Sequence, residues 1–154
     1  MRIRPATPAD IPAMIVLEKQ AATAAHWSTS QYEAAFSREA PARVILVVEE
    51  ESSLQGFIAG RAVCKEGEIE NIVVAALAQR RGLGSRLLGE FLGLARVRGA
   101  AGVFLEVRES NLAARRLYEK WAFVESGRRK SYYREPEEDA IVCHLNLSRK
   151  LHQL

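Results

Sequence analysis

Apolar residues alternate with polar ones in some segments of this chain and recur at helical spacing in others. Residues 43–50 and 54–63 are rich in apolar side chains and flank the turn Ser52-Ser53, which is typical of a β-hairpin. The segments that share this strand-like character are 2–5, 68–74, 102–107, 123 onward and 140–147. The chain is therefore expected to fold around a β-sheet.

Helical spacing separates several of these strands. Between residues 85 and 98, one helical face collects Leu87, Leu88, Phe91, Leu92 and Ala95. Other helices are predicted where Thr7 caps a start, where Ser28 or Ser30 opens one, and where Ser110 or Asn111 opens another. Each of these residue types accepts a hydrogen bond from the first turn of a helix, which is why they mark its beginning.

The order of these elements predicts the fold class. Strand, helix and strand between residues 70 and 107 form a right-handed crossover with parallel strands, whereas the other strands look antiparallel. We therefore expect a mixed α/β (α+β) fold with a central, mostly antiparallel sheet and helices on both faces.

A turn rich in Gly and Arg joins the strand at 68–74 to the helix at 85–98. Its sequence is Gln79-Arg80-Arg81-Gly82-Leu83-Gly84. Backbone N–H groups at a helix start have no intrahelical partner, and glycine lets a bulky anion approach them. Position 87 is Leu rather than the third glycine of a dinucleotide fingerprint, and the chain lacks a Gly-Lys-Ser/Thr triplet. The turn predicts a pyrophosphate site, with a simple helix cap as the alternative.

Composition narrows the class of protein. The chain has 154 residues, 22 Lys and Arg against 19 Asp and Glu, and a net charge of +3, without a long basic run. We expect a soluble cytoplasmic enzyme that binds neither a membrane nor nucleic acid directly. Its histidines and cysteines show no metal-ligand spacing, so no metal is expected, and Cys64 and Cys143 are predicted to be buried thiols, although a disulfide stays open.

Two motifs carry a resemblance to a known family. The pattern Gln-x-x-Gly-x-Gly at residues 79–84, on its strand and helix, is similar to the acetyl-coenzyme A (acetyl-CoA) signature of the GNAT acetyltransferases. The segments Leu105 to Asn111 and Leu117-Tyr118-Glu119 resemble the second half of that family, most closely its RimI branch of ribosomal-protein-alanine N-acetyltransferases. The resemblance implies one GNAT domain over residues 1–154, with a splayed pair of parallel strands.

The resemblance also implies the ligands and their contacts. Acetyl-CoA is expected in a V between residues 72–74 and 105–107, bound by Ile72, Val73, Val74, Arg80, Arg81, Gly82, Leu83, Gly84, Ser85 and Asn111. The acceptor is expected to be the N-terminal peptide of a ribosomal protein that begins with Ala. Its cleft would be walled by His26-Trp27-Ser28 and by Tyr132-Tyr133-Arg134. Because ribosomal tails are commonly basic, acidic contacts are expected from Glu68, Glu70, Glu137 and Glu138, with solvated surface charges as the alternative.

The chemistry of acetyl transfer to an amine explains two further residues. An α-amino group has a pKa near roughly 8 and is mostly protonated at neutral pH, so a base is needed. Glu106 is the only acid in an apolar strand, and the family base matches this position; alternatively it is a surface carboxylate paired with Arg108 or Arg115. Tyr118 is the candidate acid for the leaving thiolate, or else a core aromatic residue.

The sequence departs from the family pattern at Ala122, and several alternative functions remain open. Ala122 stands where the family usually has Gly, at a helix end where a left-handed backbone costs roughly 1 kcal/mol more for Ala. The same fold serves many acceptors, so an acetyltransferase for a lysine side chain or a small amine is an alternative, as is a non-catalytic acyl-CoA-binding module. The sequence does not state the acceptor, a direct or water-mediated base, or the oligomeric state.

Overall fold

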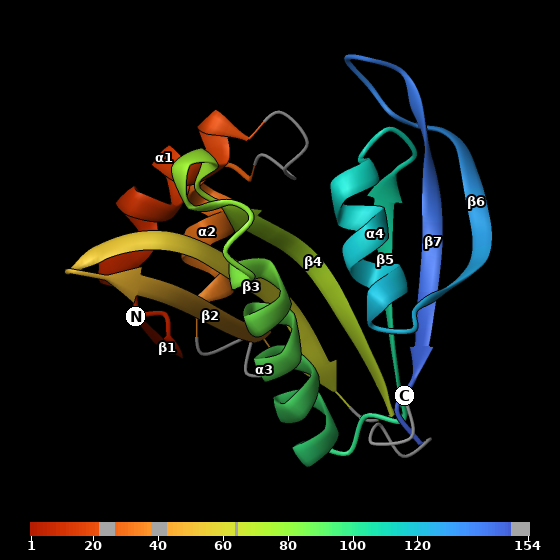
Figure 1. The fold of residues 1–154 in the computed structure, drawn as a ribbon, viewed down its shortest axis with the longest axis horizontal. Coiled ribbons are helices and arrows are strands. Elements are labelled where there is room, and N and C mark those ends of the chain that lie inside the picture. The colour runs from red at the N-terminus through yellow and green to blue at the C-terminus, as the bar shows by residue number, and fades with distance from the viewer. Residues whose placement is uncertain (22–26, 38–42, 64, 149–154) are drawn as a thin grey trace.

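The computed structural model of the protein describes residues 1–21, 27–37, 43–63 and 65–148 (Figure 1). In chain order the elements are β1 (Arg2–Pro5), η1 (Pro8–Asp10), α1 (Ile11–Gln20), α2 (Thr29–Ala35), β2 (Arg43–Glu50), β3 (Ser53–Val63), β4 (Glu66–Val74), η2 (Ala76–Ala78), α3 (Leu83–Val97), β5 (Gly102–Arg108), α4 (Leu112–Lys120), β6 (Val124–Tyr133) and β7 (Glu138–Asn146). Of the alternative caps, Ser28 and Asn111 accept the hydrogen bonds that begin α2 and α4. Among the described residues, no helix combines the length and the apolar composition that crossing a bilayer requires.

The described strands form one mixed sheet in the order β1-β2-β3-β4-β5-β7-β6. The pair β4–β5 is parallel, and the other neighbouring pairs among these strands are antiparallel. The predicted mixed, mostly antiparallel sheet is therefore confirmed. The place of β7 between β5 and β6 was not predicted, because the sequence pattern marks strands without giving their order.

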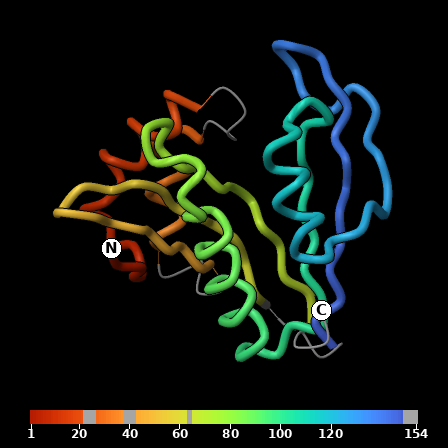
Figure 2. Tube along the Cα trace, in the orientation of Figure 1, coloured from red at the N-terminus to blue at the C-terminus, as the bar shows by residue number. Residues whose placement is uncertain are grey.

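Strands β4 and β5 pair over only part of their length. Their parallel ladder runs from Glu66 opposite Gly102 to Ile69 opposite Leu105, although both strands continue beyond it. Figures 1 and 2 show them close together near the end marked C and separating toward α1 and α4. The sheet therefore splays at this point, as the resemblance implied.

A β-bulge in β4 accompanies the splay. Opposite β3, Asn71 faces Ala59 but Ile69 faces Gly60, so Glu70 is an extra residue on β4. Such an extra residue bends its strand and increases the local twist. A Cβ on Gly60 would lie 2.3 Å from the carbonyl oxygen of Glu68, so this close approach requires glycine.

Helices cover both faces of the sheet, as predicted. One apolar cluster joins the sheet to α3 and α4 and includes Leu87, Phe91 and Tyr118. A second joins the opposite face to α1 and α2 and includes Met14, Tyr32 and Phe57. The strand that ends at Val74 supplies side chains to both clusters, so its backbone is held between two packed layers.

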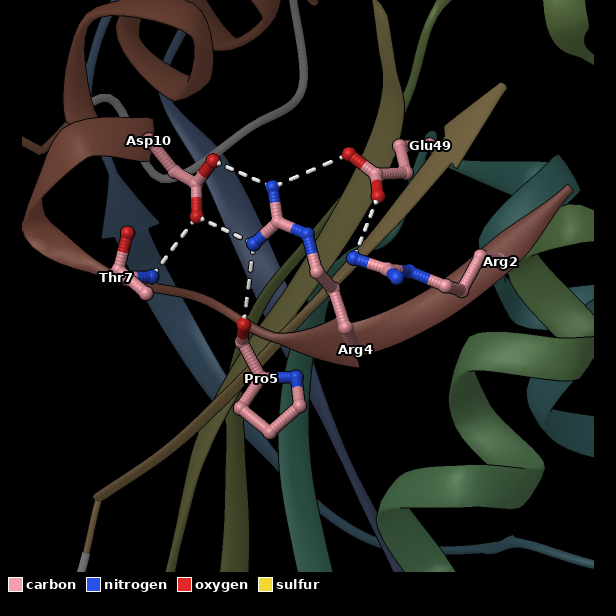
Figure 3. Close-up of polar contacts among 6 residues, drawn as sticks. All are labelled: Arg2, Arg4, Pro5, Thr7, Asp10 and Glu49. Atoms are coloured by element: carbon pink, nitrogen blue, oxygen red, sulfur yellow. Dashed lines mark hydrogen bonds and ion pairs between the residues drawn. The ribbon is translucent and has the colours of Figure 1, made fainter. Parts of the chain in front are cut away.

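A polar cluster fastens the N-terminal strand to the start of the first helices (Figure 3). The Arg4 guanidinium donates to both carboxylate oxygens of Asp10 at 2.8 and 2.9 Å and to Glu49 at 3.2 Å. Arg2 forms an ion pair with the same Glu49 at 3.0 Å, and the Thr7 N–H donates to Asp10 at 2.8 Å. The hydrogen bonds from Arg4 lower the pKa of Asp10 despite its burial. The cluster therefore ties β1, η1 and β2 together.

Candidate functional site

A cleft of about 360 Å³ lies where β4 and β5 separate. It is lined by Trp27, by Glu68 to Ile72 of β4, by Glu106 to Arg108 of β5, by Asn111, Ala114 and Tyr118 at α4, and by Tyr132 and Tyr133 of β6. Of the residues predicted from the sequence, it brings together Ile72, Glu106, Asn111 and Tyr118, with three aromatic side chains of the expected acceptor region.

The turn before α3 has the geometry of an anion site. Gly82 is the N-cap of α3 with a φ of +77°, and among the described residues no side chain forms a capping hydrogen bond there. A Cβ at Gly82 would meet nothing within 4 Å, so the turn is open on that side. Arg80 also has a positive φ, +66°, which is uncommon for a residue other than glycine. The residues present thus fit a phosphate group at this helix start.

Two side chains of this turn have other partners. The Ser85 hydroxyl accepts a hydrogen bond from the indole N–H of Trp121 at 2.9 Å, which ties α3 to the end of α4. Arg81 forms an ion pair with Glu50 of β2 at 2.6 Å. The Ser85 hydroxyl can still donate its own proton to an anion, as can its main-chain N–H, while Arg81 would have to exchange Glu50 for a phosphate.

The remaining predicted cofactor residues lie at the end of β4 and at the start of α4. Val73 is buried against α1 and α2, whereas Ile72 and Val74 pack on the side of α3 and α4. The Asn111 side chain accepts a hydrogen bond from the Ala114 N–H at 3.2 Å and lines the cleft. These residues place the end of β4 and the start of α4 on opposite sides of the cleft.

Glu106 is the first residue of β5 beyond its last parallel pair with β4, so it lies where the cleft opens. Its side chain is 18% exposed and forms an ion pair with Arg129 of β6 at 3.1 Å. The charge of Glu106, burial and a hydrogen bond with the same carboxylate raise the pKa of Tyr132. The ion pair with Arg129 of β6 thus holds the Glu106 carboxylate at the cleft.

The surface partners suggested by the sequence are occupied elsewhere. Arg108 forms its ion pair with Glu138 at 3.1 Å, and Arg115 donates to the Glu109 carbonyl at 2.8 Å. Sequence reasoning missed Arg129, because its link to Glu106 depends on the order of β5, β7 and β6 in the sheet.

Glu68 is a second carboxylate in the same cleft. It pairs with Phe104 in the parallel ladder, so it lies on the face of the sheet that carries Glu106 two positions further along. Burial raises the pKa of Glu68, and the charges of Glu70 and Glu106 raise it further. The cleft is therefore acidic on this face, which favours a cationic acceptor.

Tyr118 combines the two roles that the sequence left open. It is 5% exposed and packs against Phe123 with ring centroids 5.6 Å apart, yet it lines the cleft. Burial raises the pKa of Tyr118, and the charges of Cys143 and Tyr133 add to this effect. The phenol therefore keeps its proton at neutral pH.

The side of the cleft formed by the β6–β7 hairpin is held by the charged side chain of Arg108. The Arg108 guanidinium lies 4.3 Å from the ring centre of Tyr133 and donates to the carbonyl groups of Pro136 and Arg134, fixing the β6–β7 hairpin on β5. Burial and the charge of Glu106 raise the pKa of Tyr133 to about 12. The sequence does not predict that Arg108 anchors the β6–β7 hairpin, because a charged residue at the end of a strand is not a specific signal.

The four predicted acidic contacts separate into two groups. Glu68 and Glu70 line the cleft, whereas Glu137 and Glu138 are not among its lining residues, and Glu138 is paired with Arg108. One carboxylate oxygen of Glu70, Oε1, is buried without a hydrogen-bond donor among the described residues.

Some expected residues lie outside the part of the chain that the structure describes, namely His26, Cys64 and His152. Cys143 is a buried free thiol whose pKa is raised by burial. Within the described ranges, no group of His, Cys, Asp and Glu side chains is arranged to hold a metal ion.

Comparisons with known proteins place this chain in a family. The model of the acetyltransferase (GNAT) family matches residues 12–123. The ribosomal protein bS18-alanine N-acetyltransferase of Salmonella typhimurium is 35% identical over 141 residues, which are 90% of this chain and 93% of that protein. The crystal structure of the corresponding Escherichia coli enzyme has a TM-score of 0.84 at 30% identity and covers 97% of this chain and 95% of its own.

A further solved structure, Ard1 from Thermoplasma volcanium, has a TM-score of 0.82 at 27% identity and covers 94% of this chain and 96% of its own. The likeness therefore includes the sheet, both helical layers and the splayed strands. Because the family model and the Salmonella relative each span well over half of the sequence, the chain belongs to the GNAT family of acetyl-CoA-dependent N-acetyltransferases.

Proposed function

We propose that this enzyme transfers an acetyl group from acetyl-CoA to the N-terminal alanine amine of a ribosomal protein. The observation that carries the proposal is the cleft between β4 and β5, which joins Glu106 and Tyr118 to an acidic, aromatic acceptor wall. The relative from Salmonella typhimurium, whose name states this activity, supports the choice of acceptor.

The cofactor end of the cleft would use main-chain groups. The turn of residues 80–85 would bind the pyrophosphate of acetyl-CoA through the N–H groups at the start of α3, because Gly82 leaves that side open. Beyond Ile69, the edge of β4 that faces β5 has no ladder partner among the described strands, so it offers N–H groups to the acetyl oxygen and to the pantetheine arm. Asn111 would add a contact from the start of α4.

Glu106 would serve as the base. The acceptor amine enters as an ammonium ion, which the charges of Glu68, Glu70 and Glu106 attract. The Glu106 carboxylate then accepts a proton from the amine, so that the nitrogen lone pair can attack the thioester carbon.

Tyr118 would serve as the acid. When the tetrahedral intermediate collapses, the C–S bond breaks and the sulfur needs a proton. The buried Tyr118 phenol remains protonated and lines the cleft, so it can donate that proton to the leaving thiolate. As the amide forms, its nitrogen releases its second proton to solvent, and a proton from solvent returns to the phenolate.

Mass spectrometry of acetyl transfer tests the proposal. The enzyme receives acetyl-CoA with peptides that begin with Ala, with N-blocked peptides that contain lysine, and with small polyamines. We expect acetylation of the Ala peptides at the α-amine. Preferential acetylation of the lysine peptides or polyamines would reject the N-terminal acceptor and favour the alternative acceptor classes. The Glu106→Gln variant serves as the background for non-enzymatic acetylation.

A further inference from the structure

Glu18 in α1 is a buried carboxylate that the reaction described above does not use. Glu18 is only 2% exposed. Its Oε1 accepts hydrogen bonds from the Trp27 N–H at 3.0 Å and from the Asn71 side-chain amide at 2.8 Å, and its Oε2 accepts one from the Tyr32 hydroxyl. These three donors are neutral, and among the described residues these hydrogen bonds compensate the burial of the Glu18 carboxyl group.

The three donors come from separate parts of the chain that meet beside the cleft. Trp27 precedes α2, Tyr32 belongs to α2, and Asn71 follows the extra residue of β4. Two of them, Trp27 and Asn71, line the cleft. Burial and the hydrogen bond with Glu18 raise the pKa of Tyr32, so its hydroxyl remains a donor. One carboxylate thus holds two parts of the cleft wall.

Further contacts extend from Trp27 along this wall. Its ring packs edge-on against Tyr32 with centroids 5.3 Å apart, and the Arg43 guanidinium lies 5.3 Å from its centre. Arg43 in turn forms an ion pair with Glu70 at 3.0 Å. The position of Trp27 therefore affects an acidic residue of the cleft as well as its own ring.

The cofactor end is held by different contacts. The backbone at Asn71 is paired with Ala59 of β3, independently of its side chain. The turn before α3 is fixed by Gly82 and by the hydrogen bond between Ser85 and Trp121. Loss of the Glu18 carboxylate is thus expected to leave the phosphate-binding turn in place.

We propose that Glu18 is a positioning residue for the acceptor, which fixes Trp27 and Asn71 on the wall that the incoming peptide contacts. This role rests on the proposed function, because it concerns the acceptor side of the same cleft.

The three hydrogen bonds of Glu18 suggest three variants that test its role. In Glu18→Gln, Oε1 can still accept from Trp27 and Asn71, and the new amide can donate to the Tyr32 oxygen, which is able to accept. Glu18→Met keeps the length of the side chain but leaves the Trp27 N–H and the Asn71 amide without this acceptor. Tyr32→Phe removes one donor only.

Steady-state kinetics with an Ala peptide and calorimetry with acetyl-CoA test the proposal. For Glu18→Met we expect a rise of about tenfold or more in the KM for the peptide, since a lost buried hydrogen bond costs about 1–3 kcal/mol. The kcat at saturating peptide and the Kd for acetyl-CoA should stay within about threefold. Tyr32→Phe should raise the same KM by a few-fold, and Glu18→Gln should resemble the wild type.

Parallel losses of peptide binding, acetyl-CoA binding and melting temperature in Glu18→Met would overturn the proposal, because they mark a purely structural residue. If that variant does not fold, Tyr32→Phe decides, and an unchanged peptide KM there rejects the role. The wild type is first offered all three acceptor classes. If the proposed acceptor is wrong, the wild type will not acetylate the Ala peptide. The KM values of the variants are then measured with the amine that the wild type does acetylate.

Discussion

One end of the candidate site, the turn of residues 80–85, offers main-chain groups, whereas the other end, the cleft, is lined by side chains of β4, β5, α4 and β6 and by Trp27. At the first end, Gly82 is open and the Ser85 and Arg81 side chains are engaged elsewhere. At the second, Glu18, Arg108 and Arg129 each fix one wall through several partners. An anion is bound well by a helix start, but an extended peptide needs walls from distant elements.

This difference predicts that changes at one end leave the other unaffected. Variants at the acceptor end should alter turnover or peptide KM at constant affinity for acetyl-CoA, and variants of the turn should do the reverse.

The largest effect is expected from Glu106→Gln. Loss of a positioned base should lower turnover by about 10²–10⁴-fold, with partial recovery at high pH, where the amine loses its proton unaided. Calorimetry should show an unchanged Kd for acetyl-CoA. Glu68→Gln is the matched control in the same cleft and should lose less than about tenfold. If the two variants lose activity equally, Glu106 is not the specific base.

A double change in the turn should act on the other ligand. Gly82→Asp with Gly84→Asp brings two carboxylates to the phosphate site, so affinity for acetyl-CoA should fall by about 30-fold or more in calorimetry. Gly93→Asp is the matched control, because Gly93 also has open space around its Cβ position but lies further along α3. Equal affinity in the wild type and a folded double variant would reject the turn as the phosphate site.

Tyr118→Phe should slow the chemical step by about tenfold to 30-fold and leave the melting temperature nearly unchanged, since the packed ring is retained. Because burial raises the pKa of Tyr118 above its ordinary value, this group should cause no loss of wild-type rate as the pH rises to about 10. Rate profiles and melting curves measure both. Activity that simply follows the folded fraction would make Tyr118 a core residue only.

Outside both ends, Asp10→Asn should affect stability alone. Arg4 lowers the pKa of folded Asp10 below its unfolded value near about 4, so the pair stabilises the fold above that pH, and the gain is lost as the pH falls through the lower pKa. The variant should lose about 1–3 kcal/mol in denaturant unfolding at pH 7. That deficit should shrink in acid. Catalytic constants per folded molecule should match the wild type.

The smallest effect is expected just after α4, the helix that carries Tyr118. Ala122 has a φ of +71°, a left-handed conformation that glycine adopts without strain. Ala122→Gly should therefore raise the free energy of unfolding by about 1 kcal/mol or less, with both ligands bound as before. A lower melting temperature would show that the Ala122 methyl group contributes more by packing than it costs in strain.

The sequence predicts the elements and the cofactor end better than the acceptor end. The caps at Ser28 and Asn111 follow from residues within one turn of their positions. The strand at 43–50 has the bounds that its apolar run indicates. The glycine turn can be recognised for the same reason, because an anion site at a helix start is a local structure.

The acceptor end depends on contacts between residues far apart in the chain. The partners of Glu18 lie 9, 14 and 53 positions away, and in the sequence this residue is one more charge on an amphipathic helix. The sequence suggests Arg108 or Arg115 as the partner of Glu106, but in the fold its partner is Arg129 of β6. Neither contact can be inferred without the strand order.

The extra residue in β4 also determines how this protein tolerates changes in length. Ile69 and Ile72 pack on the same face of the sheet, three positions apart, because the bulge turns Glu70 and Asn71 together toward the other face. Removing Glu70 would restore strict alternation and keep Ile72 and Val74 on the face of α3 and α4, but the bend of the bulge would be lost. Removing a residue after the bulge would instead send every later side chain of β4 to the opposite face. A change of length in β4 is therefore expected to reverse the faces of its side chains everywhere except at the bulge, which is the one place where a residue can be lost without reversing them.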